Sequence, residues 1–188
     1  MSGHSHWSTI KRKKGAADVA RGKVFSKVVR ALTVAARQGG GDPNSNPALR
    51  AAVDKARSYN MPKSNIDAAI KRGTGGGGEI SLVEATYEGY GPEGVAFMVK
   101  VLTDNKNRTL AEIRRIFEMH GGRIVDAGSA SYIFTDPENP TFMIPVTDPA
   151  KGRKVLALAN ALDDHDDVQE VYSNFDIPDE LTAHFTNG

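Results

Sequence analysis

The sequence predicts an α+β protein, in which a three-helix bundle precedes a ferredoxin-like βαββαβ domain with one extra N-terminal strand. Three observations support this prediction. Apolar residues recur with a helical period in residues 1–72, six mostly glycine residues follow at 73–78, and strand and helix patterns alternate in residues 79–188. We therefore expect two domains, residues 1–72 and 79–188, joined by a flexible linker at 73–78.

The first domain is expected to contain one long helix and two shorter ones. The long helix runs from about residue 15 to 38 and ends at three consecutive glycines. The second begins at Asn46, a capping residue that is followed by a proline at the first helical position. A turn over residues 59–63 leads to a short third helix, which Gly73 ends.

The second domain is expected to follow the order βαββαβ after one leading strand. Its helices begin at Thr109, the first residue of a capping-box pattern, and at Asp148, which is followed by a proline. A tight connection at residues 135–140 joins two of the strands. The expected strands lie at residues 83–88, 95–102, 130–134, 141–146 and 168–175.

Charge is divided unevenly along the chain. Residues 1–72 hold 15 Lys and Arg against 4 Asp, a net of +11, whereas residues 73–188 carry a net of −10 and the whole chain only +1. A basic segment of this size predicts a polyanionic partner, and nucleic acid is the leading candidate. The alternative is that the basic domain docks on its own acidic neighbour.

The basic residues form two groups in the first domain. A run of four cations follows Trp7, which could stack on an exposed base, and other cations share one face of the long helix. The alternative for the run is a solvated arm that contacts nothing. The predicted nucleic-acid-binding residues are Trp7, Lys11, Arg12, Lys13, Lys14, Arg21, Lys23, Lys27, Arg30, Arg37, Arg50, Arg57, Lys63 and Lys71.

The second and third helices could be a helix-turn-helix, whose second helix reads base edges in the major groove. The short third helix offers Lys63, Ser64, Asn65 and Lys71 as its main donors, and few of these suit paired contacts with a base edge. We therefore favour a bundle that contacts phosphates without reading sequence.

Several function classes are not expected. The chain has no cysteine, no apolar run long enough for a membrane span, no metal-ligand spacing and no recognisable catalytic constellation. We expect a protein of the reducing cytoplasm that is not an enzyme, needs no metal and does not bind membranes. The acidic residues Asp163, Asp164, Asp166 and Asp167 are expected to be a solvated connection, or a surface that docks a basic protein.

Six stretches of the chain resemble the YebC/PmpR family. They are residues 3–14 (GHSHWSTIKRKK), 35–43 (AARQGGGDP), 60–63 (NMPK), 87–92 (YEGYGP), 102–109 (LTDNKNRT) and 166–176 (DDVQEVYSNFD). The resemblance implies a DNA-binding transcriptional regulator without cofactor or enzymatic activity. It also implies an alternative, because mitochondrial and some bacterial members are linked to translation at the ribosome, where ribosomal RNA would be the partner.

The sequence departs from the family in one place. Members usually carry a further small α/β domain between the strands that match residues 129–134 and 141–146, whereas here residues 135–140 bridge that gap. The chain therefore resembles a compact variant of the family. Three hypotheses remain: a DNA-binding regulator, a ribosome-associated translation factor, and an adaptor that binds protein through its acidic domain.

Overall fold

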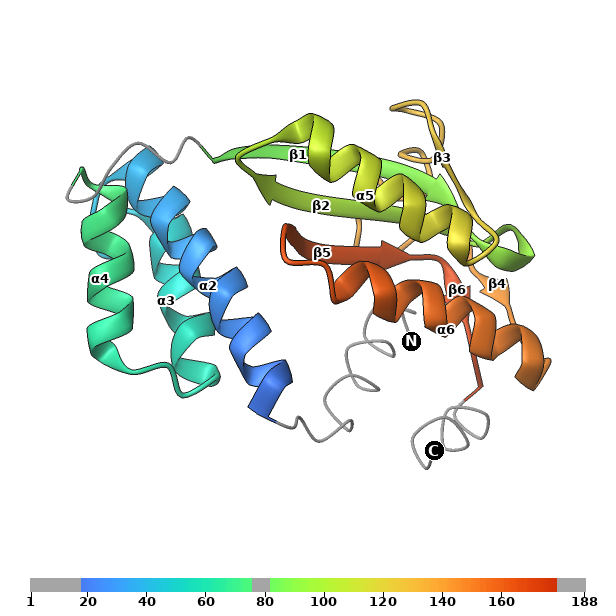
Figure 1. Cartoon of the computed structure of the whole chain (residues 1–188), viewed down its shortest axis with the longest axis horizontal. Coiled ribbons are helices and arrows are strands. Elements are labelled where there is room, and N and C mark those ends of the chain that lie inside the picture. The colour runs from blue at the N-terminus through green and yellow to red at the C-terminus, as the bar shows by residue number, and fades with distance from the viewer. Residues whose placement is uncertain (1–17, 76–81, 179–188) are drawn as a thin grey trace. The chain divides into compact units, whose positions relative to one another are not determined.

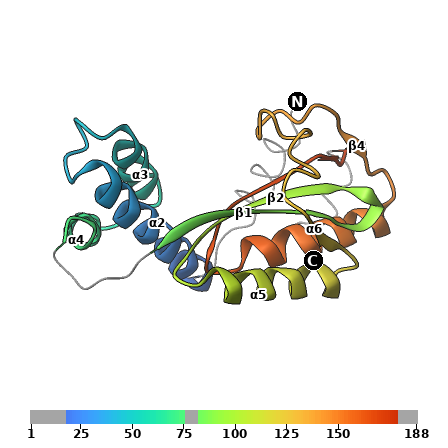
Figure 2. The same ribbon diagram turned by 90° about the horizontal axis from the view of Figure 1, so that it is seen from above.

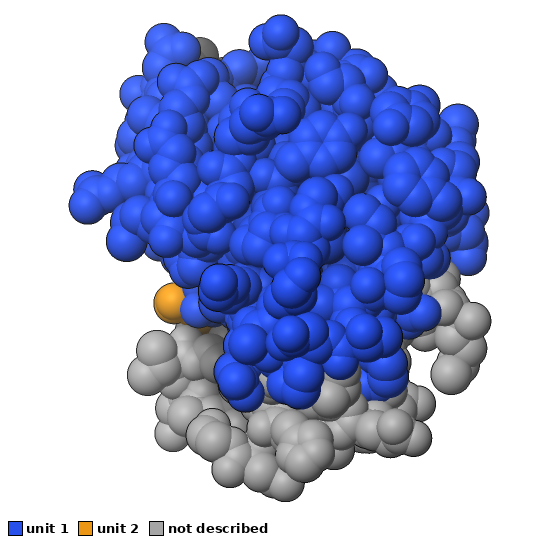
Figure 3. Space-filling model, turned by 90° about the vertical axis from the view of Figure 1, so that its right-hand side faces the viewer, with its two compact units in different colours: residues 1–15, 84–188 blue, residues 16–83 orange. Residues whose placement is uncertain are grey.

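The computed structural model describes residues 18–75 and 82–178, with side chains from Lys23 onward. The chain divides into two compact units, one built from residues 16–83 and one from residue 84 onward (Figure 3). We call them the helical unit and the sheet unit. Both kinds of secondary structure are present, so the predicted α+β class is confirmed. No helix among the described residues is long and apolar enough to cross a membrane.

The helical unit consists of α2 (Asp18–Gly39), α3 (Pro47–Ser58) and α4 (Lys63–Gly73). Helix α2 ends where Gly40 takes a φ of +84°, a conformation that glycine adopts without steric cost. Helix α3 begins as expected, because the Asn46 side chain accepts a hydrogen bond from the Leu49 amide at 3.0 Å. The same side chain donates to the carbonyls of Ala35 at 2.7 Å and Gly40 at 2.9 Å. Asn46 therefore joins the end of α2 to the start of α3.

Helices α3 and α4 both pack against α2 (Figure 1). Gly73 lies within α4 and is buried, and a Cβ atom there would come within 2.3 Å of the Thr33 carbonyl oxygen. The first residue of the predicted linker is therefore a close contact between two helices. The core of the unit contains Val28, Leu32, Ala35, Ala36, Leu49, Val53, Ala56, Met61, Ile66 and Ala69.

The sheet unit has a four-stranded antiparallel sheet with the order β3-β1-β2-β5. Its elements are β1 (Val83–Tyr90), the 3-10 turn η1 (Pro92–Gly94), β2 (Ala96–Thr103), α5 (Lys106–Met119), β3 (Arg123–Val125), β4 (Ile144–Pro145), α6 (Pro149–Asp163), β5 (Val168–Ser173) and β6 (Phe175–Asp176). From β2 to β5 the order is βαββαβ, as predicted, and β6 follows. Strand β1 lies between β2 and β3, the place that the third strand takes in a ferredoxin-like sheet, while β4 pairs separately with β6.

Each face of this sheet is covered differently. Helices α5 and α6 cover one face, and residues 126–143 lie over the other (Figure 2). Alternate side chains of β2 point to opposite faces of the sheet. Phe97 packs edge to face on Phe117 of α5, whereas Met98 belongs to the cluster with Ile133 on the other face. Strand β2 is consequently buried on both sides.

Two predicted strands differ from the structure, and one strand was not predicted. The strand expected at 130–134 is a series of turns, and its apolar residues Ala130, Ile133 and Phe134 are buried against the second face of the sheet. The strand expected at 141–146 shortens to β4, and β3 was not expected at all. The connection at 135–140 is closed at its base, where the Thr141 amide donates to the Ile133 carbonyl at 2.8 Å.

The start of α5 also differs from the prediction. The helix begins one turn earlier than Thr109, because the side chain of Asn105 accepts a hydrogen bond from the Arg108 amide at 3.1 Å. Thr109 lies inside the helix, where its hydroxyl contacts Thr103 and Asp167. The start of α6 is as predicted, since Asp148 accepts from the amides of Ala150 and Lys151.

Candidate nucleic-acid interface

The predicted binding residues of the N-terminal arm cannot be placed. Trp7, Lys11, Arg12, Lys13 and Lys14 lie outside the described residues, and Arg21 lies in α2 with its side chain outside the described part. They stay predictions.

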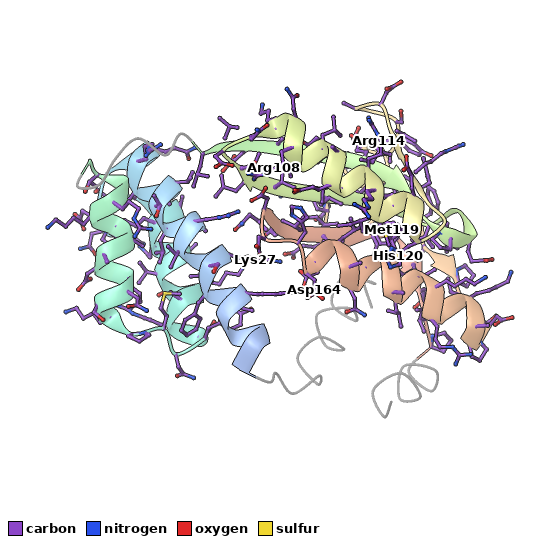
Figure 4. All side chains as sticks on the ribbon, in the orientation of Figure 1. Lys27, Arg108, Arg114, Met119, His120 and Asp164 are labelled. Carbon is purple, nitrogen blue, oxygen red and sulfur yellow. The ribbon has the colours of Figure 1, made fainter. Side chains whose placement is uncertain are left out.

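Four of the predicted cations lie on α2. Lys23, Lys27, Arg30 and Arg37 are spaced four, three and seven residues apart, so that they follow one face of the helix. Figure 4 shows Lys27 extending from α2 on the side away from α3 and α4. The opposite face carries Val28 and Leu32 into the core of the unit. The sequence therefore predicted correctly which face of this helix is cationic and which face is buried.

Three further predicted cations come together at an open groove between α3 and α4. The groove has a volume of about 520 Å³, and Arg57 comes from α3 while Lys63 and Lys71 come from the two ends of α4. Both helices pack on α2, which leaves the space between them uncovered. The groove is lined by Gly41, Pro43, Val53, Arg57, Met61, Lys63, Ile66, Asp67, Ile70, Lys71 and Thr74.

The charges of the groove remain available to a ligand. Arg57 approaches Asp54 at 3.7 Å, but both side chains are largely exposed, and such pairs contribute little. Lys63 and Lys71 form no ion pair with any described residue. Asp67 is the one acidic residue of the lining, so three cations face one carboxylate. Lys63 and Lys71 are eight residues apart, which places them about 12 Å apart along the helix axis.

Arg50 has a different place. Its Nε donates to the Pro43 carbonyl at 3.0 Å and its Nη2 to the Asn44 carbonyl at 2.8 Å. These bonds hold the connection between α2 and α3, and Arg50 does not line the groove. The structure thus gives this predicted binding residue a local supporting role.

The acidic stretch at the end of α6 is more than a solvated connection. The side chain of Asp167 is 3% exposed, and its Oδ2 accepts hydrogen bonds from Arg108 Nη2 at 2.6 Å and Thr109 Oγ1 at 2.7 Å. The prediction was therefore wrong for Asp167. Figure 4 shows Arg108 near the start of α5 and Asp164 at the end of α6. Hydrogen bonding to Asp167 raises the pKa of Arg108.

Asp167 belongs to a group with metal-ligating chemistry. Ligand atoms of Glu112, His165 and Asp167 lie within 4.8 Å of one another. Arg108 already supplies positive charge there, because its Nε lies 3.8 Å from Glu112 and its Nη2 contacts Asp167. This network was missed from the sequence, although its residues fall in or near two of the stretches that carry the family resemblance, 102–109 and 166–176.

Comparison with protein families gives two matches along the chain. Residues 5–76 match the TACO1/YebC protein N-terminal domain, and residues 82–138 match the TACO1/YebC second and third domain. The second match ends within the connection at 135–140.

Individual relatives support the same assignment. A probable transcriptional regulatory protein of Dictyoglomus turgidum is 42% identical, over 96% of this chain and 98% of the relative. One from Rubrobacter xylanophilus is 43% identical, over 97% and 98%. The crystal structure of a conserved hypothetical protein from Aquifex aeolicus is similar with a TM-score of 0.82 and 34% identity, covering 93% of this chain and 98% of that chain.

The relatives are longer than this chain. The alignment with the Dictyoglomus turgidum protein runs over 245 positions, whereas the chain has 188 residues, so at least 57 positions of the alignment have no counterpart here. This difference agrees with the expectation that a segment found in other members is absent. The family matches and the near full-length relatives together establish that the chain belongs to the TACO1/YebC family.

Proposed function

We propose that this protein is a nucleic-acid-binding regulator of gene expression, which acts on DNA as a transcriptional regulator through its helical unit. The observation that carries the proposal is the convergence of Arg57, Lys63 and Lys71 on one groove. The net charge of +11 in residues 1–72 supports it, as does the description of the relatives as probable transcriptional regulatory proteins. The protein acts in the cytoplasm and without catalysis.

Phosphate contacts account for this binding. Cations that neutralise phosphates release condensed counterions, and this supplies affinity that does not depend on sequence. The exposed start of α4 presents Lys63, Ser64 and Asn65; only Asn65 has an amide that suits a paired contact, with adenine, and no arginine stands there to pair with guanine. The groove is thus suited to hold and orient a nucleic-acid backbone more than to read base edges.

The salt dependence of binding tests the role of the groove. We would measure fluorescence anisotropy of a labelled DNA duplex between about 50 and 200 mM salt. The combined variant Arg57→Gln, Lys63→Gln, Lys71→Gln loses up to three phosphate contacts, so the slope of log affinity against log salt becomes shallower by up to about 2.7. The matched control Lys106→Gln, Arg114→Gln, Arg115→Gln removes the same charge from three exposed positions of α5. A slope that changes equally in both variants contradicts the proposal.

The nature of the nucleic acid needs a measurement in cells. DNA crosslinking of the tagged protein is expected to give discrete promoter peaks. Sedimentation of a lysate at low and moderate salt is expected to leave the protein outside the ribosomal fractions. Migration with ribosomes and an absence of discrete DNA peaks would instead identify RNA as the partner.

A further inference from the structure

The sheet unit carries an aromatic and cationic surface in spite of its acidic composition. Tyr90 ends β1 and is paired in register with Arg123 of β3, so that both side chains emerge on the same face of the sheet. Tyr132 lies close to the Tyr90 hydroxyl and is 60% exposed. Arg123 is exposed and forms no ion pair with any described residue. We call Tyr90, Arg123 and Tyr132 the tyrosine–arginine surface.

A hollow of about 520 Å³ adjoins this surface. Tyr90 and Arg123 line it together with four glycines, Gly91, Gly94, Gly121 and Gly122. Gly94 and Gly121 have φ values of +73° and +75°, which disfavour other residues. A Cβ at Gly91 would meet Leu158 at 2.6 Å, and one at Gly122 would meet the Tyr90 carbonyl oxygen at 2.7 Å. Glycine is therefore required at these positions by the packing and the backbone conformation of the turns that line the hollow.

The surface is held in place by hydrogen bonds from β1. The buried carboxylate of Glu88 accepts from the amides of Gly128 at 2.9 Å, Ala130 at 2.6 Å and Ser131 at 3.0 Å. The Tyr90 hydroxyl donates to the Ser129 carbonyl at 3.2 Å. These bonds fix the segment that presents Tyr132, so its ring is exposed at a defined position.

We propose that the tyrosine–arginine surface binds an unpaired nucleotide, with the base stacked on Tyr132 and the phosphate against Arg123. An exposed tyrosine offers a stacking platform for any base, and arginine adds a phosphate contact. The glycine-lined hollow gives room for the neighbouring nucleotide. This inference rests on the proposed function and adds a second contact, on the sheet unit, which recognises unpaired nucleotides.

Two labelled probes test the inference on the full chain: a blunt duplex, and the same duplex with a short single-stranded extension, each as DNA and as RNA. Wild-type protein is expected to bind the extended probe more tightly. Tyr132→Ala is expected to lower affinity for the extended probe by about 5- to 100-fold while leaving blunt-duplex binding unchanged. Tyr132→Phe keeps the stacking ring and is expected to restore binding. Arg123→Gln is expected to make binding of the extension less sensitive to salt.

The control is Phe142→Ala, which removes another exposed aromatic from the same face-covering segment, residues 126–143. Equal affinity of wild type and Tyr132→Ala for the extended probe would overturn the inference, as would an equal loss in Phe142→Ala. A combined Arg57→Gln, Lys63→Gln, Lys71→Gln variant that binds neither probe, together with a Tyr132→Ala variant that binds both normally, would support the proposed function and refute the second contact. Binding of a free single strand that survives in the groove variant and is lost in Tyr132→Ala would support the second contact alone. If the single-stranded extension raises affinity more for the RNA probe than for the DNA probe, the bound nucleotide belongs to RNA; the reverse result assigns it to DNA.

Discussion

Replacement of Asn46 should loosen the junction between α2 and α3. The side chain is buried and forms three hydrogen bonds, one as acceptor and two as donor. In Asn46→Ala the lost cap costs about 1 kcal/mol. The buried Ala35 carbonyl keeps its helical bond but loses the one from Asn46, which costs about 0.5–1.5 kcal/mol, whereas the exposed Gly40 carbonyl can turn to water. The free energy of unfolding of the helical unit should therefore fall by about 1.5–2.5 kcal/mol.

Hydrogen exchange measured by mass spectrometry reports this unit separately from the sheet unit. Amides of α3 should exchange about 10- to 70-fold faster in Asn46→Ala, the ratio that corresponds to the lost free energy. Asn44→Ala, an exposed replacement in the same connection, should leave exchange unchanged. A change below threefold at Asn46 would refute the idea that its side chain holds the junction.

The variant Asn46→Asp distinguishes the hydrogen bond that Asn46 accepts at the start of α3 from the two hydrogen bonds that it donates to the end of α2. The new carboxylate keeps the acceptor for the Leu49 amide, but its second oxygen faces the carbonyls of Ala35 and Gly40. This repulsion should raise the pKa of the introduced carboxyl in the folded state above its ordinary value of about 3.9. Stability relative to wild type should therefore be greatest below that value and decrease as pH rises through the raised pKa. If this variant is as stable as the wild type at pH 7, the two hydrogen bonds that Asn46 donates contribute nothing to stability.

Three further changes have defined outcomes. Gly73→Ala should speed hydrogen exchange in α4 and lower the free energy of unfolding by about 1–3 kcal/mol, because its Cβ would press on the Thr33 carbonyl. Unchanged exchange would mean that α2 and α4 can move apart to admit a methyl group without loss of stability. Asp167→Asn should lower the stability of the sheet unit by about 2 kcal/mol, measured by denaturant unfolding, because the charge-assisted bond to Arg108 is weakened. Hydrogen bonds from the Lys151 and Ala150 amides lower the pKa of Asp148, so protection at the start of α6 should persist above the ordinary carboxyl pKa and decline as pH falls through the lowered one. The variant Asp148→Asn should not show this decline.

Local signals in the sequence were sufficient for the helical unit. The glycines after α2, the Asn46 cap and the apolar spacing of each helix all appear in the structure as expected. The groove was beyond these signals, because Arg57 and Lys71 come from different helices whose separation depends on how each packs against α2. Periodicity predicts which face of a helix is buried, but not where two helices leave a space.

The sheet unit shows where apolar patterns mislead. Burial of Ala130, Ile133 and Phe134 was correctly indicated by their apolar character, but they are buried by turns over the sheet instead of by a strand within it. Strand β3 has only three residues, too few to show an alternating pattern. At α5, the sequence predicted the cap at Thr109, whereas the structure has it one turn earlier at Asn105.

Long-range polar contacts were also out of reach. Asp167 stands in a run of acidic residues that suggests a solvated loop, yet it pairs with Arg108, 59 positions earlier in the chain. A charged side chain that is buried needs an oppositely charged or hydrogen-bonding partner. Sequence spacing does not reveal a partner that is far away along the chain.

The closed base of the connection at 135–140 makes it a place where the chain can change length. The Ile133 carbonyl and the Thr141 amide are bonded across it, so whatever lies between them enters and leaves at one point. Lengthening a loop whose ends are already together costs little closure entropy, about 0.6 kcal/mol for each doubling. Neither end belongs to the four-stranded sheet, so strand pairing is untouched by the insertion or deletion of residues. A whole domain can therefore be gained or lost here during evolution, while the sheet and the helical unit are inherited unchanged.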